Sequence, residues 1–247
     1  MTVTQNRTEI HNLTPIERQA RYWNDESQAF DAIYSHRKSA LSNWLDRVFR
    51  RDMYERFRFA VERSQPIAGR TVLDLGCGSG RYVVALAEAG ASRVLGIDIA
   101  PRMLELAREL AAEHGVADRC EFQLTDVLGL DAGAGPGFDV VLAIGLFDYI
   151  RDPAPALSKI RAVTAGRAII SFPRLLTWRA LPRKLRLALR GCEVHFYSRA
   201  AILRLLNETG FSLQEIRRVG KLDCVVAVPG VAASGRQDPA LVTAQSQ

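Results

Sequence analysis

A short apolar segment of this chain runs directly into three glycines at alternating positions. Residues 71–75 read Thr-Val-Leu-Asp-Leu, and Gly76, Gly78 and Gly80 follow. The apolar run predicts a buried strand, and glycines at this spacing allow a tight turn whose backbone N–H groups lie close to a ligand. A helix predicted from about Arg81 would point its partly positive N-terminus at the same place. The pattern therefore predicts an α/β fold with a ligand at this turn.

A second predicted strand ends in an acid and narrows the class of ligand. Residues 93–98 end at Asp98, whose carboxylate could accept hydrogen bonds from both hydroxyls of a ribose. An adenosine-type cofactor fits this arrangement. The spacing Gly-x-Gly-x-Gly differs from the Gly-x-Gly-x-x-Gly that holds the pyrophosphate of dinucleotides. A nicotinamide-dependent oxidoreductase is therefore disfavoured.

Four segments, in order, resemble the motifs of class I S-adenosylmethionine-dependent methyltransferases over roughly residues 71–228. Residues 74–80 are similar to the family's E/D-x-G-x-G-x-G turn, and residues 98–107 to its D-x-S-x-x-M-L-x-x-A segment. Residues 122–127 are similar to its adenine-contacting element, and residues 138–143 to its fourth strand. The resemblance implies S-adenosyl-L-methionine as the cofactor. The implied cofactor-binding residues are Asp74, Gly76, Cys77, Gly78, Gly80, Asp98, Ile99, Met103, Asp126, Val127 and Ile144.

The resemblance also implies roles for single residues. Asp74 would orient the glycine turn and reach the methionine moiety, often through water, and Asp126 would accept a hydrogen bond from the adenine amino group. Ala100 stands where the family commonly has serine or proline. Two alternatives stay open, because Asp74 could serve only the strand and its turn, and Asp126 could be an exposed loop acid.

The residues that would bind the methyl acceptor have no sequence motif as specific as the glycine turn. Asp148 and Tyr149 follow the predicted fourth strand, where the family's acceptor and methionine ends meet, and Asp148 is a candidate base. His195 is a second candidate base because its ordinary pKa lies near neutrality, with packing or hydrogen bonding as its alternative. The segment after the fourth strand lacks the Asn-Pro-Pro-Tyr or Asp-Pro-Pro-Tyr of DNA and glutamine N-methyltransferases. The candidate substrate-binding residues are Tyr22, Tyr34, Tyr149 and Arg174.

Strand and helix patterns alternate along the chain, which predicts a doubly wound, Rossmann-like, mostly parallel seven-stranded sheet with helices on both faces. The predicted strands are 71–75, 93–98, 120–124, 138–144, 167–172, 212–218 and 222–228, and the predicted helices are 81–89, 101–114, 153–163 and 199–209. The predicted organisation is a flexible start at 1–15, a helical N-terminal cap at 16–65, the cofactor-binding domain at 66–229 with a basic insertion at 174–190, and a disordered tail at 230–247.

The insertion at 174–190 contains arginines, a lysine and leucines but no acid. It could contact an anionic membrane surface, bind an anionic acceptor or act as a lid, and a plain surface helix is the alternative. The chain has a net charge of +6, but its sequence contains no recognisable nucleic-acid-binding module. No nucleic-acid partner is therefore expected. The oligomeric state is left open.

The four cysteines and four histidines show no metal-ligand spacing, so no metal site is expected. No apolar run reaches the roughly 18 residues of a membrane span, and a cytoplasmic protein is predicted. Together these features predict an S-adenosylmethionine-dependent methyltransferase that modifies oxygen or nitrogen of a small organic acceptor, anionic and amphiphilic compounds included. The alternative is a non-catalytic binding or regulatory subunit that has kept the fold. 

Overall fold

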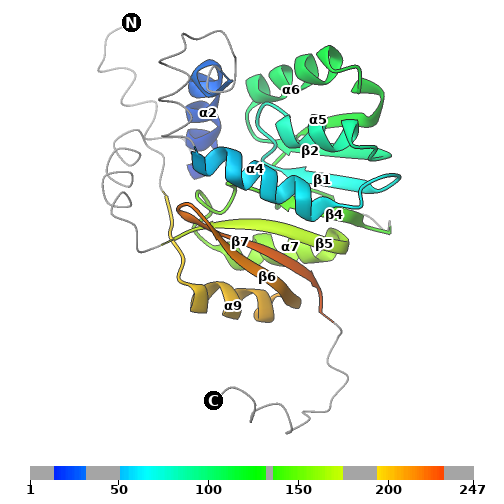
Figure 1. Ribbon diagram of the computed structural model, residues 1–247. Coiled ribbons are helices and arrows are strands. Elements are labelled where there is room, and N and C mark those ends of the chain that lie inside the picture. The colour runs from blue at the N-terminus through cyan, green and yellow to red at the C-terminus, as the bar shows by residue number, and fades with distance from the viewer. Residues whose placement is uncertain (1–13, 32–50, 132–135, 175–193, 231–247) are drawn as a thin grey trace, which may run out of the picture.

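The computed structural model describes residues 14–31, 51–131, 136–174 and 194–230. Its seven strands form one sheet in the order β3-β2-β1-β4-β5-β7-β6 (Figure 1). The strands β1 to β5 run parallel, and β7 is antiparallel to both of its neighbours. The predicted mostly parallel seven-stranded sheet is therefore confirmed. The strands are β1 Thr71–Leu75, β2 Arg93–Asp98, β3 Cys120–Leu124, β4 Phe138–Ala143, β5 Thr164–Pro173, β6 Phe211–Val219 and β7 Leu222–Pro229.

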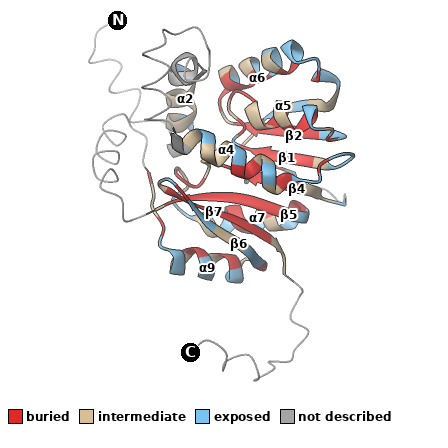
Figure 2. Ribbon diagram, viewed as in Figure 1, coloured by how far each residue is buried: buried red, intermediate tan, exposed pale blue. Residues whose placement is uncertain are grey.

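Helices cover both faces of this sheet, as predicted. The described helices are α2 Pro15–Asp31, α4 Arg51–Ser64, α5 Arg81–Glu88, α6 Pro101–Glu113, α7 Pro153–Val163 and α9 Arg199–Glu208, with a 3₁₀ turn at Ala117–Arg119. Successive strand residues point to opposite faces, so Val72 packs with α4, α5 and α6, whereas Leu73 packs with α7 and α9. Both faces of the central strands are consequently buried (Figure 2).

The strand β5 is longer than the sequence predicts. It begins at Thr164, directly after α7, whereas the apolar pattern predicts a start at 167. The Thr164 hydroxyl still donates to the carbonyl of Ile160 in α7, at 2.6 Å. Residues 165 and 166 are exposed, so no apolar alternation marks them. Pairing with β4 extends the strand there, through a register shift between Phe138 and Val140.

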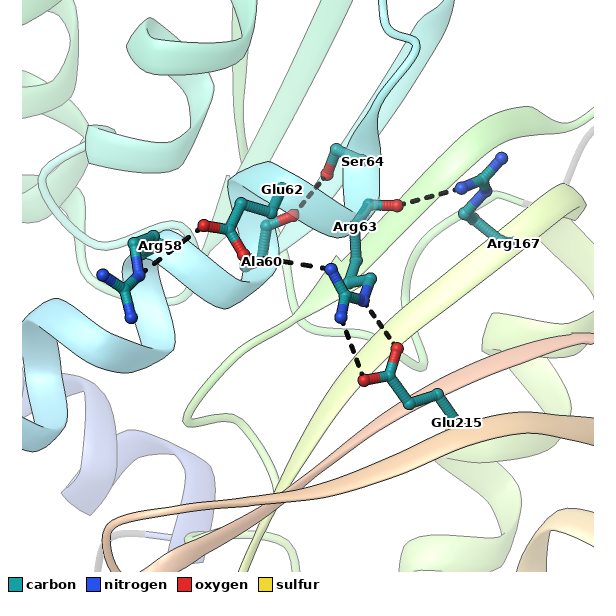
Figure 3. A network of polar contacts seen from close by, with 7 residues as sticks. All are labelled: Arg58, Ala60, Glu62, Arg63, Ser64, Arg167 and Glu215. Carbon is teal, nitrogen blue, oxygen red and sulfur yellow. Dashed lines mark hydrogen bonds and ion pairs between the residues drawn. The ribbon is translucent and has the colours of Figure 1, made fainter.

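The helix α4, within the predicted N-terminal cap, packs against one face of the sheet. Phe59 and Ala60 are almost fully buried in the core beneath it. At its end, the Arg63 guanidinium donates from Nε and Nη2 to the two carboxylate oxygens of Glu215 in β6, at 2.6 and 3.1 Å. Arg167 of β5 donates to the Arg63 carbonyl at 3.0 Å, which satisfies an orphan acceptor of the last turn (Figure 3). This network fixes α4 across one face of the sheet.

The helix α2 contacts a different part of the molecule. Its Asn24 side chain accepts a hydrogen bond from the backbone N–H of Arg102, at 3.1 Å, in the first turn of α6. Its Trp23 ring lies edge-on to Tyr149, with ring centroids 5.5 Å apart. Because α6 follows β2 and Tyr149 follows β4, α2 reaches two places at the carboxyl edge of the sheet. Within the predicted cap, α2 thus lies near the predicted site.

Some predictions fall on parts of the chain whose structure is not described. These are the candidate substrate residue Tyr34, the insertion beyond Arg174, and the predicted flexible start and disordered tail apart from residues 14, 15 and 230. Among the described helices, none is long and apolar enough to cross a bilayer.

Candidate functional site

The glycine turn after β1 has the backbone conformation that its glycines permit. Gly76, Gly78 and Gly80 have φ angles of 71°, 53° and 78°, a region that residues with a Cβ rarely adopt. The N–H groups of Gly76 and Cys77 both donate to the carbonyl of Ile97 in β2, at 2.9 Å. The turn therefore bends against the end of β2, where Asp98 stands. 

Asp98 ties the glycine turn to the start of α6. Its Oδ2 accepts from the N–H of Gly78 and its Oδ1 from the N–H of Ala100, both at 2.9 Å. The carboxylate is 9% exposed, and this burial raises its pKa although the backbone hydrogen bonds lower it in part. Each oxygen keeps a further lone pair, so the carboxylate can still accept hydrogen bonds from ligand hydroxyls.

Asp74, in β1, is a buried acid beside the same turn. Its side chain is 2% exposed, and its Oδ2 has no hydrogen-bond partner within the described ranges. The Ser79 hydroxyl oxygen, in the turn itself, is likewise buried with no partner there. Burial, reinforced by the charge of Asp98, raises the pKa of Asp74 to about 8. Buried polar atoms in this state are expected to have a ligand or water as their partner.

The other candidate cofactor residues differ in how far they are buried. Met103, Val127 and Ile144 are buried, and Ile99 is half-buried. Asp126 is half-buried, and its Oδ1 accepts a hydrogen bond from the N–H of Gly129 within its own loop. Both carboxylate oxygens keep lone pairs, so Asp126 can still accept a hydrogen bond from the adenine amino group, as predicted.

Cys77 contributes a buried side chain to this region. A Cβ placed on Gly96 of β2 would lie 2.9 Å from the Cys77 sulfur, so the thiol packs against β2. Burial raises the pKa of the thiol well above its ordinary range. A cofactor contact by Cys77 would therefore come from its backbone.

The segment after β4 contains the acceptor-side candidates. Gly145, with φ of 83°, turns the chain, and its N–H donates to the Ser171 hydroxyl of β5 at 2.8 Å. A Cβ on Gly145 would lie 3.4 Å from Nη1 of Arg56 and 3.9 Å from Oδ2 of Asp148. Asp148 is 3% exposed. A buried carboxylate and an arginine of α4 thus both approach the turn at the end of β4.

The backbones of the two candidate bases meet in the structure. The backbone N–H of His195 donates to the carbonyl of Asp148 at 2.8 Å, although the two residues are far apart in the sequence. Tyr22, Tyr149 and Phe196 pack against the buried side chain of Val194. The helix α2, the segment after β4 and the segment after residue 193 therefore meet at one place.

Tyr197 packs in the core beside this place. Its ring lies 5.2 Å from that of Phe172, and its hydroxyl donates to the carbonyl of Ile150 at 3.2 Å. Burial raises the pKa of Tyr197 to about 12, and the negative charges of Asp148 and Asp152 add to the shift. The residue stays a neutral phenol at physiological pH. 

Sequence reasoning missed Asn24 and Ser171. Each is a common polar residue, and each reaches the site from an element remote in sequence. The sequence does predict that a basic run near the site could attract anions, and Arg56 is the member that the structure places at the turn after β4. The run consists of Arg47, Arg50, Arg51, Arg56 and Arg58.

Asp74→Asn should change how stability depends on pH. In the unfolded chain this carboxyl has a pKa near 4, whereas its pKa in the folded state is about 8. The native state thus keeps a proton that the unfolded chain releases, so the free energy of unfolding falls as pH rises through this window. Urea unfolding at pH 5 and pH 8 should show the variant gaining up to about 4 kcal/mol over wild type between the two values.

The matched control for this experiment is Asp118→Asn, which removes one carboxylate from a side chain that is 77% exposed. An Asp74→Asn protein with the same pH dependence as wild type would contradict the assignment of a raised pKa to Asp74.

Comparisons with known proteins place this geometry in a family. Residues 67–228 match the profile of a family described as a methyltransferase domain. The ribosomal protein L11 methyltransferase of Aeromonas hydrophila is 41% identical over 92 residues, which are 37% of this chain and 30% of that protein. The Escherichia coli protein of the same name is 38% identical over 95 residues, or 38% of this chain and 31% of that protein. The chain therefore spans only about a third of the length of these curated relatives.

Solved structures share the fold. The magnesium protoporphyrin IX methyltransferase of Synechocystis PCC 6803, solved with bound SAH, has a TM-score of 0.71 at 23% identity, over 88% of this chain and 100% of that one. A structure from Listeria monocytogenes, titled as a methyltransferase dependent on S-adenosylmethionine, has a TM-score of 0.57 at 18% identity, over 71% of this chain and 99% of that one. The profile match covers most of the chain, so the predicted resemblance is confirmed, and the protein belongs to the methyltransferase-domain family.

Proposed function

We propose that this protein is an enzyme that transfers a methyl group from S-adenosyl-L-methionine to an oxygen or nitrogen atom of a small organic acceptor. The observation that carries the proposal is the pair of buried carboxylates at the glycine turn. Asp98 holds the turn through Gly78, and Asp74 has an oxygen without a partner among the described residues. Both acids have a raised pKa, so a ligand that brings hydrogen-bond donors or positive charge would stabilise their ionised forms.

The chemistry of the implied cofactor fits these two acids. Its ribose hydroxyls and its ammonium group are donors, and its sulfonium is positively charged, whereas both carboxylates are acceptors. A dinucleotide would instead bring a pyrophosphate, which is held by a Gly-x-Gly-x-x-Gly turn and not by the Gly-x-Gly-x-Gly spacing found here. Asp98 would hold the ribose, and Asp74 with Ser79 would bind toward the methionine part. When bound, S-adenosyl-L-methionine supplies an electrophilic methyl group.

The residues after β4 would orient the acceptor and receive its proton. Asp148 is buried at the turn that Gly145 makes, near Arg56. Its backbone carbonyl accepts a hydrogen bond from the backbone N–H of His195. A carboxylate or imidazole there can accept a proton from an acceptor hydroxyl or amine. The contacts of α2 with Tyr149 and with the start of α6 support a role for α2 in excluding water.

A small acceptor is favoured over a protein acceptor by these α2 contacts, because they cover the segment after β4 with aromatic side chains. The L11 relatives are named for a protein acceptor, but the shared portion is only about a third of their length. We therefore propose that the acceptor is an anionic or amphiphilic small molecule. A small-molecule screen in which no compound is methylated would favour a protein acceptor instead.

The test combines binding and turnover. Calorimetry should show binding of S-adenosylmethionine and S-adenosylhomocysteine but not of NADH. A screen of phenols, carboxylic acids and amines with a tritiated methyl donor should then identify an acceptor. With that acceptor, Asp148→Asn should lower turnover by about 100-fold or more, the range expected for a proton acceptor, while binding of S-adenosylhomocysteine is retained.

The control is Asp152→Asn, which removes the same charge from an exposed side chain four residues away and should retain turnover. A folded protein that binds neither adenosyl ligand would overturn the proposed function and favour a binding or regulatory subunit. Equal effects of the two substitutions would refute the role of Asp148.

A further inference from the structure

Three charged residues gather at the carboxyl end of β5. Asp223, the second residue of β7, is 2% exposed and lies in register with Phe172 of β5. Arg199, the first residue of α9, donates from Nε and from Nη2 to Oδ1 of Asp223, at 3.2 Å each. The Nε of Arg174 lies 3.8 Å from the other oxygen, Oδ2. One buried carboxylate thus stands between two guanidinium groups, and the cluster has a net positive charge.

Arg174 and Arg199 have more donors than this cluster uses. The Arg174 guanidinium makes the 3.8 Å ion pair but no hydrogen bond to any described residue, and its side chain is only 20% exposed. Arg199 uses two of its N–H groups on Asp223, and its side chain is 49% exposed. A guanidinium presents five N–H donors in a planar fork that matches the oxygens of a carboxylate or phosphate.

The backbone holds Arg174 in a defined place at the sheet edge. Its N–H donates to the carbonyl of Lys221 at 3.0 Å, and the N–H of Tyr197 donates to the carbonyl of Pro173 at 2.8 Å. Arg174 and Tyr197 pair as a parallel bridge. The guanidinium is therefore presented from strand-like backbone, which limits the conformational entropy lost when a ligand binds.

The cluster lies beside the acceptor-side candidates. The hydroxyl of Tyr197 reaches the carbonyl of Ile150, in the segment after β4. Arg174 directly follows β5 and comes three residues after Ser171, whose hydroxyl accepts a hydrogen bond from the N–H of Gly145. At the rise of a strand, the two backbones lie about 10 Å apart, and the odd separation points the two side chains to opposite faces. An acceptor would therefore pass over the end of β5 to span from the turn after β4 to Arg174.

Maintenance of the fold explains only part of this arrangement. A buried carboxylate needs a cation and hydrogen bonds, and Arg199 supplies both to Asp223. Arg174 adds a second positive charge without adding a hydrogen bond. We propose that Arg174 and Arg199 form a subsite for an oxyanion of the methyl acceptor, a carboxylate or a phosphate, and that Asp223 positions the two guanidinium groups. This assignment rests on the proposed function and specifies its acceptor as an anion.

The test uses simple anions as probes on the full chain saturated with S-adenosylhomocysteine. Sodium acetate and sodium phosphate are titrated separately at constant ionic strength, and the arginine Nε–Hε signals are followed by NMR. The signals of Arg174 and Arg199, assigned from the variants, should shift in a saturable manner with at least one anion. The anion that saturates at the lower concentration identifies the carboxylate or the phosphate as the preferred group.

Three glutamine substitutions and one lysine substitution separate this subsite from general surface charge. Arg174→Gln and Arg199→Gln should each raise the dissociation constant of the probe by about tenfold, the effect of losing a charged hydrogen bond. Arg204→Gln removes one charge from an exposed position of α9 and should leave the constant nearly unchanged. Melting curves recorded on each variant check that it is folded, and Arg174→Lys keeps the charge but should bind the probe more weakly than wild type.

Shifts that do not saturate with either anion, or equal losses in all three glutamine variants, would overturn the subsite. Calorimetry with S-adenosylhomocysteine on the same samples tests the proposed function separately. Absence of adenosyl-ligand binding would refute that function, whereas normal adenosyl-ligand binding without an arginine response would refute only the anion subsite.

Discussion

Asp98→Ala should lower the affinity for S-adenosylhomocysteine by at least about 100-fold, because the two proposed hydrogen bonds from the ribose hydroxyls to this carboxylate are lost and each contributes roughly 1.5–3 kcal/mol. In the structure this carboxylate accepts from the N–H groups of Gly78 and Ala100. Its removal leaves both donors without their acceptor and releases the glycine turn from the start of α6. It also removes the proposed acceptor for the ribose hydroxyls. Calorimetric titration of the variant beside wild type measures the loss.

Two comparisons make this result specific. Asp98→Asn keeps one carbonyl oxygen for the backbone donors, so its affinity should lie between those of wild type and Asp98→Ala. Asp118→Ala removes an acid from an exposed side chain and should bind the ligand as wild type does. Retention of wild-type affinity by a folded Asp98→Ala protein would exclude Asp98 from the cofactor site.

Gly80→Ala should give the largest loss of stability among single substitutions in the glycine turn. The residue has φ of 78°, and an added Cβ would lie 2.8 Å from Cβ and 3.0 Å from Cα of Ala107 in α6. The left-handed conformation costs an alanine about 1–2 kcal/mol. Overpacking against a helix adds roughly 1–3 kcal/mol. Urea unfolding should therefore show a total loss of about 2–5 kcal/mol, with weaker binding of the adenosyl ligands.

Gly115→Ala is the matched control for backbone strain. Gly115 has φ of 67°, and a Cβ there would meet nothing within 4 Å, so only the strain of about 1–2 kcal/mol should appear. Ala107→Gly should recover part of the stability of Gly80→Ala, because it removes the nearest atom, and should have no such effect on Gly115→Ala. Equal losses in the two alanine variants would show that contact with α6 does not restrict position 80.

The strands and helices around the site were predictable because their patterns are local. The predicted strand at 71–75 and the predicted helix at 153–163 agree with β1 and α7 in both bounds. Each has an apolar period or a flanking glycine or proline that acts over a few residues. The early start of β5 was not predictable, because residues 165 and 166 are exposed and join the strand only through pairing with β4.

The two acids at the glycine turn were also predictable, since Asp74 lies within an apolar strand and Asp98 ends the next one. The protonation state of these acids was not predictable. That Asp74 has a pKa raised to about 8 depends on complete burial and on Asp98 in the neighbouring strand. Burial of this kind arises only when α4, α5 and α6 cover that face of the sheet.

The local order of residues therefore suffices to predict the glycine turn, the order of strands and helices along the chain, and the class of cofactor. Each of these depends on patterns, such as the glycine spacing and the acids on the strands, that extend over only a few residues. Only the folded chain brings Asn24 to the start of α6, Arg56 to the turn after β4, and Arg174 with Arg199 to Asp223. These pairs join residues from separate elements, and sequence spacing carries no information about which arginine or asparagine meets which partner. Packing of the helices on the sheet decides those contacts.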